Sequence, residues 1–165
     1  MIKRALVALV ACMALAVVAA ACGGGGDTTG GGDSTEASGS APTKAAFIHQ
    51  ADKICGEAEE RLNEEVAEYA EEKNIPIEKE EPTQAQQVEI YAAVVLPNVA
   101  QQGEELAALT PPEGDEKTIE EITDALASGV EEAEADPKQL TEGKNPLADA
   151  SKQARAYGMK SCGNE

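Results

Sequence analysis

The sequence predicts an all-α protein, a small antiparallel bundle of about four helices behind a signal peptide and a disordered glycine-rich tether. Three observations lead to this prediction. Apolar residues recur at intervals of three and four through most of residues 45–165, which is the spacing of one helix face. Turns rich in proline and glycine separate these stretches, and none of them alternates as a strand would. Alanine is abundant and favours helix.

The N-terminal segment, residues 1–21, has the order of an export signal. Lys3 and Arg4 precede an apolar run of 17 residues, Ala5–Ala21, which is shorter than the roughly 20 residues of a membrane-spanning helix. Cys22 follows the run, and a glycine-rich polar stretch follows Cys22. This order predicts a removed signal peptide and an acylated cysteine.

The residues before Cys22, Val18-Ala19-Ala20-Ala21, resemble the lipobox of bacterial lipoproteins, although Ala19 stands where leucine is commoner. The resemblance implies a diacylglyceryl thioether on Cys22, usually with further N-acylation. Two or more acyl chains suffice for stable anchoring. We therefore expect the membrane to be a partner through the lipid anchor, with the protein on its outer face.

There are three alternatives to acylation of Cys22. Cys12 follows a better lipobox, but cleavage there leaves an apolar segment of only 7 residues and a new N-terminus that is still apolar. We reject it for that reason. Ala19-Ala20-Ala21 also fits an ordinary signal-peptidase site, which would release a soluble protein. In the third alternative the segment stays uncut as an anchor.

Residues 22–44 contain the acylated cysteine and almost no apolar side chain, so they cannot order themselves by burial. A glycine-rich chain of this length spans about 25 Å on average. We expect it to tether a folded domain, residues 45–165, close to the membrane.

The first helix is predicted over about 44–73 and the second over about 84–109. Thr43 or a neighbour can cap the first helix, and Asn74-Ile75-Pro76 ends it. Thr83 and Gln86 fit a capping box for the second. Pro97 lies inside the second helix and predicts a kink near residues 94–97. The expected apolar positions of the second helix are Val88, Tyr91, Val95, Val99, Leu106 and Leu109.

Two further helices complete the bundle. Asp115 can cap the third, which Asp136-Pro137 stops, and its apolar face is Ile119, Ile122, Leu126, Val130 and Ala133. A loop follows. Asn145-Pro146 offers a cap and a first-turn proline for the fourth helix, which ends near Gly158. Its apolar face is Leu147, Ala150, Ala154 and Tyr157.

The predicted export from the cell indicates the chemical state of each cysteine. Cys12 leaves with the signal and Cys22 is acylated, so Cys55 and Cys162 remain as a pair in an oxidising compartment. In an up-and-down bundle the start of the first helix lies beside the end of the fourth. We expect a structural disulfide between them. A redox-active pair is the alternative, but catalytic pairs are usually close in sequence.

Charge and composition exclude several functions. Loss of Lys3 and Arg4 leaves 11 basic and 31 acidic residues, a net charge of −20, so we expect no binding to nucleic acid. His49 is the single histidine and has no evident catalytic partner. The cysteines needed for a zinc site are already assigned. We predict no enzyme activity, no cofactor and no metal, beyond weak cation binding at Glu104/Glu105 or Glu120/Glu121.

Three motifs resemble a group of small actinobacterial lipoproteins and secreted proteins of unknown function. They are Ala51-Asp52-Lys53-Ile54-Cys55, the turn from Leu106 through Leu109 to Pro111-Pro112, and Tyr157-Gly158 followed by Cys162. The resemblance spans roughly 45–163. It implies a helical fold with the pair Cys55–Cys162, and it implies no activity.

Two hypotheses for function follow. The first is a noncatalytic, lipid-tethered helical module that contacts another component of the cell envelope through its surface. The alternative is a lipoprotein that binds a small molecule or cation in a pocket between helices, near Pro97, where freed backbone carbonyls can face a cavity. A pocket lined by His49, Tyr91 or grouped carboxylates would favour the alternative.

Overall fold

A computed structural model of the chain describes residues 41–77 and 80–163. The predicted signal peptide, the predicted lipidation site Cys22 and nearly all of the predicted tether lie outside these residues. The described residues form helices and turns and contain no strand, which confirms the all-α prediction. The helices are α1 (Lys44–Lys73), α2 (Gln84–Ile90), the π-helix η1 (Tyr91–Val95), α3 (Leu96–Ala107), α4 (Glu116–Ala135), α5 (Lys138–Thr141) and α6 (Ala148–Tyr157).

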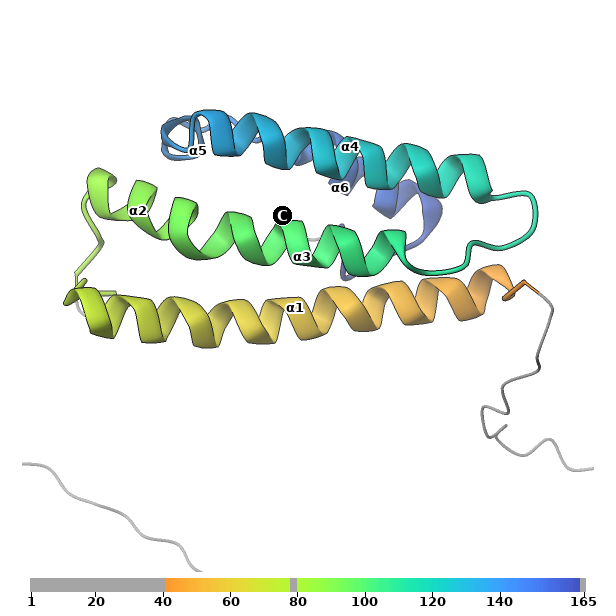
Figure 1. The fold of residues 1–165 in the computed structure, drawn as a ribbon, viewed down its shortest axis with the longest axis horizontal. Helices are drawn as coiled ribbons and strands as arrows, with labels where there is room; N and C mark the ends of the chain where they lie inside the picture. The colour runs from red at the N-terminus through yellow and green to blue at the C-terminus, as the bar shows by residue number, and fades with distance from the viewer. Residues whose placement is uncertain (1–40, 78–79, 164–165) are drawn as a thin grey trace, which may run out of the picture. The chain divides into compact units, whose positions relative to one another are not determined.

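Three long antiparallel segments make up most of the domain (Figure 1). The continuous run of α2, η1 and α3 lies between α1 and α4, and α3 packs against both of these neighbours. The short helix α6 lies behind this layer and packs on α4. It completes a four-helix arrangement over part of the length of the bundle.

Helix ends follow the predicted capping residues closely. The Thr43 hydroxyl accepts a hydrogen bond from the Ala46 N–H, and Asn74 ends α1 in the left-handed conformation at φ 55°. Thr83 and Gln86 form the predicted capping box at the start of α2. These side chains satisfy backbone N–H groups that have no partner within the helix. The bounds of α1 therefore match the sequence prediction.

Pro97 interrupts the second long helix, as predicted, and the interruption takes the form of a π-turn. The Leu96 N–H donates to the carbonyl of Tyr91, five residues earlier. This turn takes up one extra residue before a proline that cannot donate a backbone hydrogen bond itself. The extra residue rotates the buried face.

The predicted apolar face of this helix is therefore only partly right on the N-terminal side of Pro97. Ile90, Val94 and Leu96 are the buried apolar residues there, whereas the predicted positions Val88, Tyr91 and Val95 are half-buried. Leu106 is buried as predicted, because the helix regains regular spacing after the π-turn.

Three details of the C-terminal half correct the sequence prediction. Asp115 occupies the cap position of α4, but its side chain makes no capping bond and instead accepts a hydrogen bond from the Tyr157 hydroxyl. The predicted loop after α4 contains the extra helical turn α5. Helix α6 begins at Ala148, about two residues late, because Asn145 and Pro146 form a turn in which Asn145 Oδ1 accepts from the Leu147 N–H.

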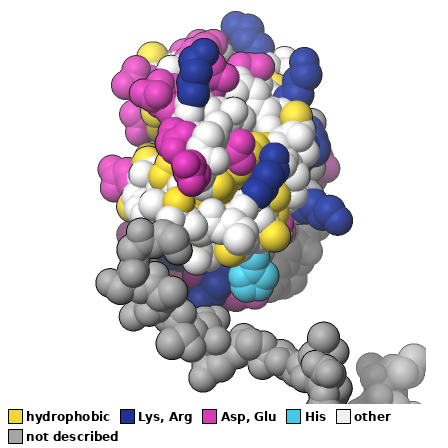
Figure 2. All heavy atoms as spheres, turned by 90° about the vertical axis from the view of Figure 1, so that its right-hand side faces the viewer, with side chains coloured by type: hydrophobic (Ala, Val, Ile, Leu, Met, Phe, Trp, Pro, Cys, Tyr) yellow, Lys and Arg dark blue, Asp and Glu magenta, His cyan; other side chains and the backbone are white. Residues whose placement is uncertain are grey.

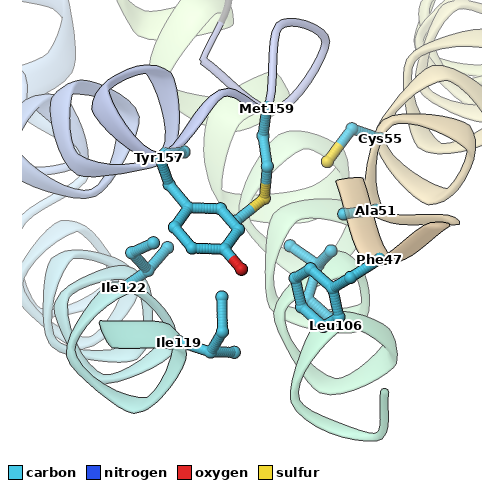
Figure 3. Close-up of a cluster of buried hydrophobic side chains, with 9 residues drawn as sticks. Phe47, Ala51, Cys55, Leu106, Ile119, Ile122, Tyr157 and Met159 are labelled. Carbon is cyan, nitrogen blue, oxygen red and sulfur yellow. The ribbon is translucent and has the colours of Figure 1, made fainter. Parts of the chain in front are cut away.

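The buried apolar residues form two clusters. The larger one, here called the disulfide end, brings together α1, α3, α4, α6 and the segment after α6 around Phe47 and Tyr157, whose rings meet edge to face (Figure 3). The smaller one, here called the open end, consists of Ala70, Ile75 and Ile90, with Val66, Tyr69 and Val95 packed against them. Most of the core therefore lies where the fourth helix is present.

Helix lengths explain this distribution. At 1.5 Å per residue, α1 with 30 residues is about 45 Å long and α6 with 10 residues is about 15 Å long. The fourth helix can therefore cover only about a third of the length of α1.

Candidate functional site

The candidate site is a crevice of about 330 Å³ between α1, α3, α4 and α6. Aliphatic side chains make up most of its lining, and each of the four helices contributes some of them. These include Ala58 and Leu62 of α1, Val99 and Leu106 of α3, Ile122 and Leu126 of α4, and Ala150 and Ala154 of α6. Its volume lies at the lower end of the range for ligand pockets.

Two glycines position the wall that α6 provides. A β-carbon at Gly129 of α4 would lie 2.6 Å from the Pro146 carbonyl oxygen, so glycine allows the segment before α6 to lie directly on α4. Leu147, the next residue, lines the crevice. Gly158 ends α6 at φ 119°, a conformation that other residues rarely adopt. The chain then turns so that Met159 is buried and lines the crevice as well.

The disulfide forms another part of the wall. Cys55 of α1 is bonded to Cys162, as predicted, and both residues line the crevice. Beside this bond, Asp52 Oδ1 accepts a hydrogen bond of 2.7 Å from the Ser161 backbone N–H. The covalent bond and the hydrogen bond together hold residues 159–162 against α1.

The polar side chains of the crevice are Glu59, Asn98, Gln102, Ser151 and Ser161. Asn98 is only 5% exposed, and its Nδ2 donates a hydrogen bond of 3.3 Å to Glu65 of α1. Glu59 is exposed and is the one ionisable group among the lining residues outside the disulfide. The crevice therefore offers neutral polar groups and a carboxylate beside aliphatic walls.

The ionisable group with the largest pKa shift lies outside the crevice. Burial raises the pKa of Tyr157, and the hydrogen bond of 2.7 Å from its hydroxyl to Asp115 and the charge of Asp115 raise it further. The Lys44 ammonium lies 3.8 Å from the centre of the Tyr157 ring. These contacts join the start of α1, the start of α4 and the end of α6, so their role is to fix the packing of the disulfide end.

A second hollow lies between α3 and α4, with a volume of about 340 Å³. We call it the α3–α4 groove. Small residues of both helices make up much of its lining, among them Ala100, Gly103, Ala107 and Ala127. Four exposed carboxylates also line it, those of Glu104, Asp124, Glu131 and Glu134. This groove is thus apolar in the middle and acidic around it.

The structure separates the other candidate residues from the crevice. His49 is exposed on α1, and Tyr91 is half-buried in η1. Figure 2 faces the end of the bundle where α1 begins and shows acidic, basic and hydrophobic side chains interspersed there. Two of the carboxylates predicted to bind cations weakly have basic neighbours. Glu105 Oε1 lies 3.8 Å from Arg61 Nη2, and Glu121 Oε1 lies 3.2 Å from Lys117 Nζ.

The described residues show neither a metal site nor a membrane span. Residues 41–77 and 80–163 contain no group of three or more histidine, cysteine or acidic side chains placed to hold a metal ion. Over the same ranges, no helix combines the length and the hydropathy of a membrane span.

Most residues that line the crevice were not predicted from the sequence. Asn98, Gln102, Leu147, Ser151 and Met159 line it and were not candidate residues. One signal was present in the sequence: the first predicted helix is more than twice as long as the fourth. A short fourth helix cannot fill the whole interior of a bundle, and this mismatch predicts an uncovered stretch beside the long helices.

Comparison with the models of known protein families, with curated protein sequences and with solved structures finds no match to this chain. The resemblance to small actinobacterial lipoproteins therefore stays a prediction.

Proposed function

We propose that this protein is a noncatalytic binding module, anchored by lipid on Cys22 to the outer face of the cell membrane, and that the crevice between α1, α3, α4 and α6 is its binding site. The observation that carries the proposal is the geometry of the crevice. Aliphatic walls from four helices surround a volume of about 330 Å³ with a few neutral polar side chains. Such a combination is typical of sites that bind small molecules.

The surroundings of the crevice support binding rather than catalysis. Acid–base catalysts usually carry pKa values shifted by burial or by neighbouring charge. The shifted pKa of Tyr157 arises in a packed contact with Asp115, and Tyr157 does not line the crevice. Cys55 and Cys162, which do line it, are bonded to each other far apart in sequence.

The anchor is tested separately from the crevice. We expect cells that express the full chain to incorporate a labelled fatty acid into the protein and to retain it in the membrane fraction. The Cys22→Ser variant should lose both the label and the retention. A wild-type protein without label would contradict the anchor and leave the crevice proposal unaffected.

The crevice is tested with a library of small uncharged fragments. The mature chain carrying Cys22→Ser is titrated, and its backbone amide signals are followed by nuclear magnetic resonance. We expect fragments to shift signals of residues that line the crevice, such as Leu62, Gln102 and Ser151. If no fragment shifts these signals at millimolar concentration, the crevice is not a binding site.

A second candidate function is contact with a basic partner in the cell envelope, as the charge of the chain predicts. The α3–α4 groove favours it, since four carboxylates surround small apolar residues. A basic amphipathic helix of a partner protein would match both features. Crosslinking in cells, with wild type and an Ala127→Arg variant compared, tests this candidate. A partner captured equally by both proteins would contradict a contact through this groove.

A further inference from the structure

We propose that the crevice takes a single aliphatic chain of medium length, attached to a neutral or cationic head group. This inference rests on the proposed function, because it names the ligand class of the same crevice. Size, wall chemistry and charge each lead to it.

Size limits the ligand to one chain. At about 330 Å³ the crevice lies at the lower end of the range for pockets that hold small-molecule ligands. One chain of medium length fits this space, and the two long chains of a membrane phospholipid do not fit together.

Wall chemistry favours an aliphatic ligand over an aromatic or sugar ligand. The lining contains leucine, isoleucine, valine, alanine and methionine side chains and no aromatic ring. Sugars and nucleobases are usually held by stacking on aromatic faces, which this lining does not offer. Flexible methionine and leucine side chains, such as Met159 and Leu62, adapt well to a hydrocarbon chain.

Charge selects the head group. No lysine, arginine or histidine is among the lining residues, and the single ionisable side chain outside the disulfide is Glu59. The whole chain is also strongly acidic, with a formal net charge of −18. An anionic head group would meet repulsion both from Glu59 and from the field of the protein. A neutral or cationic head avoids it.

The neutral polar side chains give the head group a place. Ser151 and Gln102 are half-buried, from α6 and α3, and Glu59 of α1 is exposed. A chain that lies among Leu62, Leu106 and Ile122 would then leave its polar end toward these residues and solvent. Burial of the chain supplies the affinity, and the polar residues orient the ligand.

The test uses single-chain amphiphiles below their micelle concentrations and the mature chain with Cys22→Ser. Isothermal titration compares maltosides of six, ten, twelve and sixteen carbons. We expect affinity to rise about fourfold for each methylene that is buried, up to the ten- or twelve-carbon maltoside, and then to level off. Continued growth at the same rate to sixteen carbons, or no dependence on length, would overturn the proposal.

The head group is tested at fixed chain length. Dodecyltrimethylammonium and dodecyl maltoside should bind at least tenfold more tightly than laurate, and added salt should reduce the difference. Equal or tighter binding of laurate would overturn the choice of head group. Phosphatidylcholine vesicles form a further arm: binding of the protein to them identifies a bilayer lipid as a source of the chain, and binding of monomeric amphiphile without vesicle binding identifies a free amphiphile.

A filling variant locates the chain. Ser151→Leu adds bulk to the crevice wall and should weaken dodecyl maltoside binding at least tenfold. Ala127→Leu adds bulk to the α3–α4 groove and is the matched control, with binding unchanged. If Ser151→Leu fails to fold, which thermal denaturation reports, Gln102→Trp, which also adds bulk, serves in its place. Equal binding by filling variant and control would place the chain elsewhere on the protein.

The outcomes also separate this inference from the proposed function. Fragments that shift crevice signals, together with alkyl maltosides that do not bind, would show a binding site for another ligand class. If neither fragments nor maltosides bind at the crevice, both proposals are overturned.

Discussion

The two ends of the bundle differ in what holds them together. The disulfide end combines the disulfide between Cys55 and Cys162, the buried ring of Phe47 and the hydrogen bond from the Tyr157 hydroxyl to Asp115. The open end has a smaller cluster around Ala70, Ile75 and Ile90, and the single turn α5 lies against α2 instead of a full fourth helix. A small domain can thus concentrate its stability at one end.

The crevice lies at the edge of the better-supported end. Its lining includes the disulfide and residues of the larger cluster, such as Leu106 and Ala154. A binding site gains affinity when its walls are fixed before the ligand arrives. The walls of the crevice include the covalently bonded part of the domain, and walls fixed in this way would favour the proposed binding.

Removal of the disulfide should have the largest effect on this comparison. Cys55 and Cys162 are 107 positions apart, and closing a loop of about 100 residues is worth about 4–5 kcal/mol in the unfolded-chain model. We expect the Cys55→Ala/Cys162→Ala variant to lose most of that free energy of unfolding in urea. Wild type unfolded under reducing conditions is the control. Equal stability of oxidised and reduced wild type would contradict the stabilising role of the bond.

Truncation of matched core residues should separate the two ends. Leu106→Ala at the disulfide end and Ile90→Ala at the open end each remove a buried side chain, at a cost of about 2–5 kcal/mol when unfolding is global. We expect Leu106→Ala to cost the full amount. Ile90→Ala should cost less in global unfolding and should mainly speed amide exchange in α2 and the last turns of α1. The reverse order would show that the open end governs stability.

The pH dependence of the free energy of unfolding should reveal the contribution of the Tyr157 hydroxyl. Because its pKa is raised in the folded protein by burial and by Asp115, the unfolded chain releases this proton first as pH rises through about 10. The contribution of Tyr157 is therefore complete below that pH and is lost above it, by at most about 1.4 kcal/mol per pH unit. Tyr157→Phe should be less stable at pH 7 and should lose less stability between pH 9 and 11. Parallel pH profiles of variant and wild type would contradict the account.

Loss of a helix cap should have the smallest effect on the free energy of unfolding, and this effect should be similar at the two ends. Thr83→Ala at the start of α2 and Thr43→Ala at the start of α1 each remove one capping side chain, worth about 1 kcal/mol. We expect Thr83→Ala to increase amide exchange within α2, because few other contacts hold that helix. A loss well above 2 kcal/mol from Thr83→Ala, measured by urea unfolding, would mean that the open end is more cooperative than its packing indicates.

Local signals in the sequence predicted the helices well. Thr43, Asn74 and the pair Thr83/Gln86 set helix ends through bonds to their own neighbours, so spacing alone reveals them. The interruption at Pro97 was predicted for the same reason. The disulfide followed from the order of helices in an up-and-down bundle. Each of these features depends on residues near in sequence or on simple topology.

Features that depend on tertiary contacts were missed. The side chain of Asp115 meets Tyr157, 42 positions away, so its expected cap is lost. Asn98 lies beside the crevice next to the predicted apolar residue Val99, and the extra residue in η1 that rotates the buried face was not predicted. The crevice itself results from the short length of α6 and from residues of four helices, which no local pattern reports.

Nuclear Overhauser contacts between the protein and a bound amphiphile would show directly whether the crevice holds an aliphatic chain. The mature chain with Cys22→Ser, labelled at leucine and isoleucine methyl groups, is mixed with dodecyl maltoside below its micelle concentration, and nuclear Overhauser contacts to the ligand methylenes are recorded. The account predicts contacts to Leu62, Leu106 and Ile122 of the crevice. Contacts confined to the open end, such as Ile77, whose side chain is 38% exposed, would contradict it.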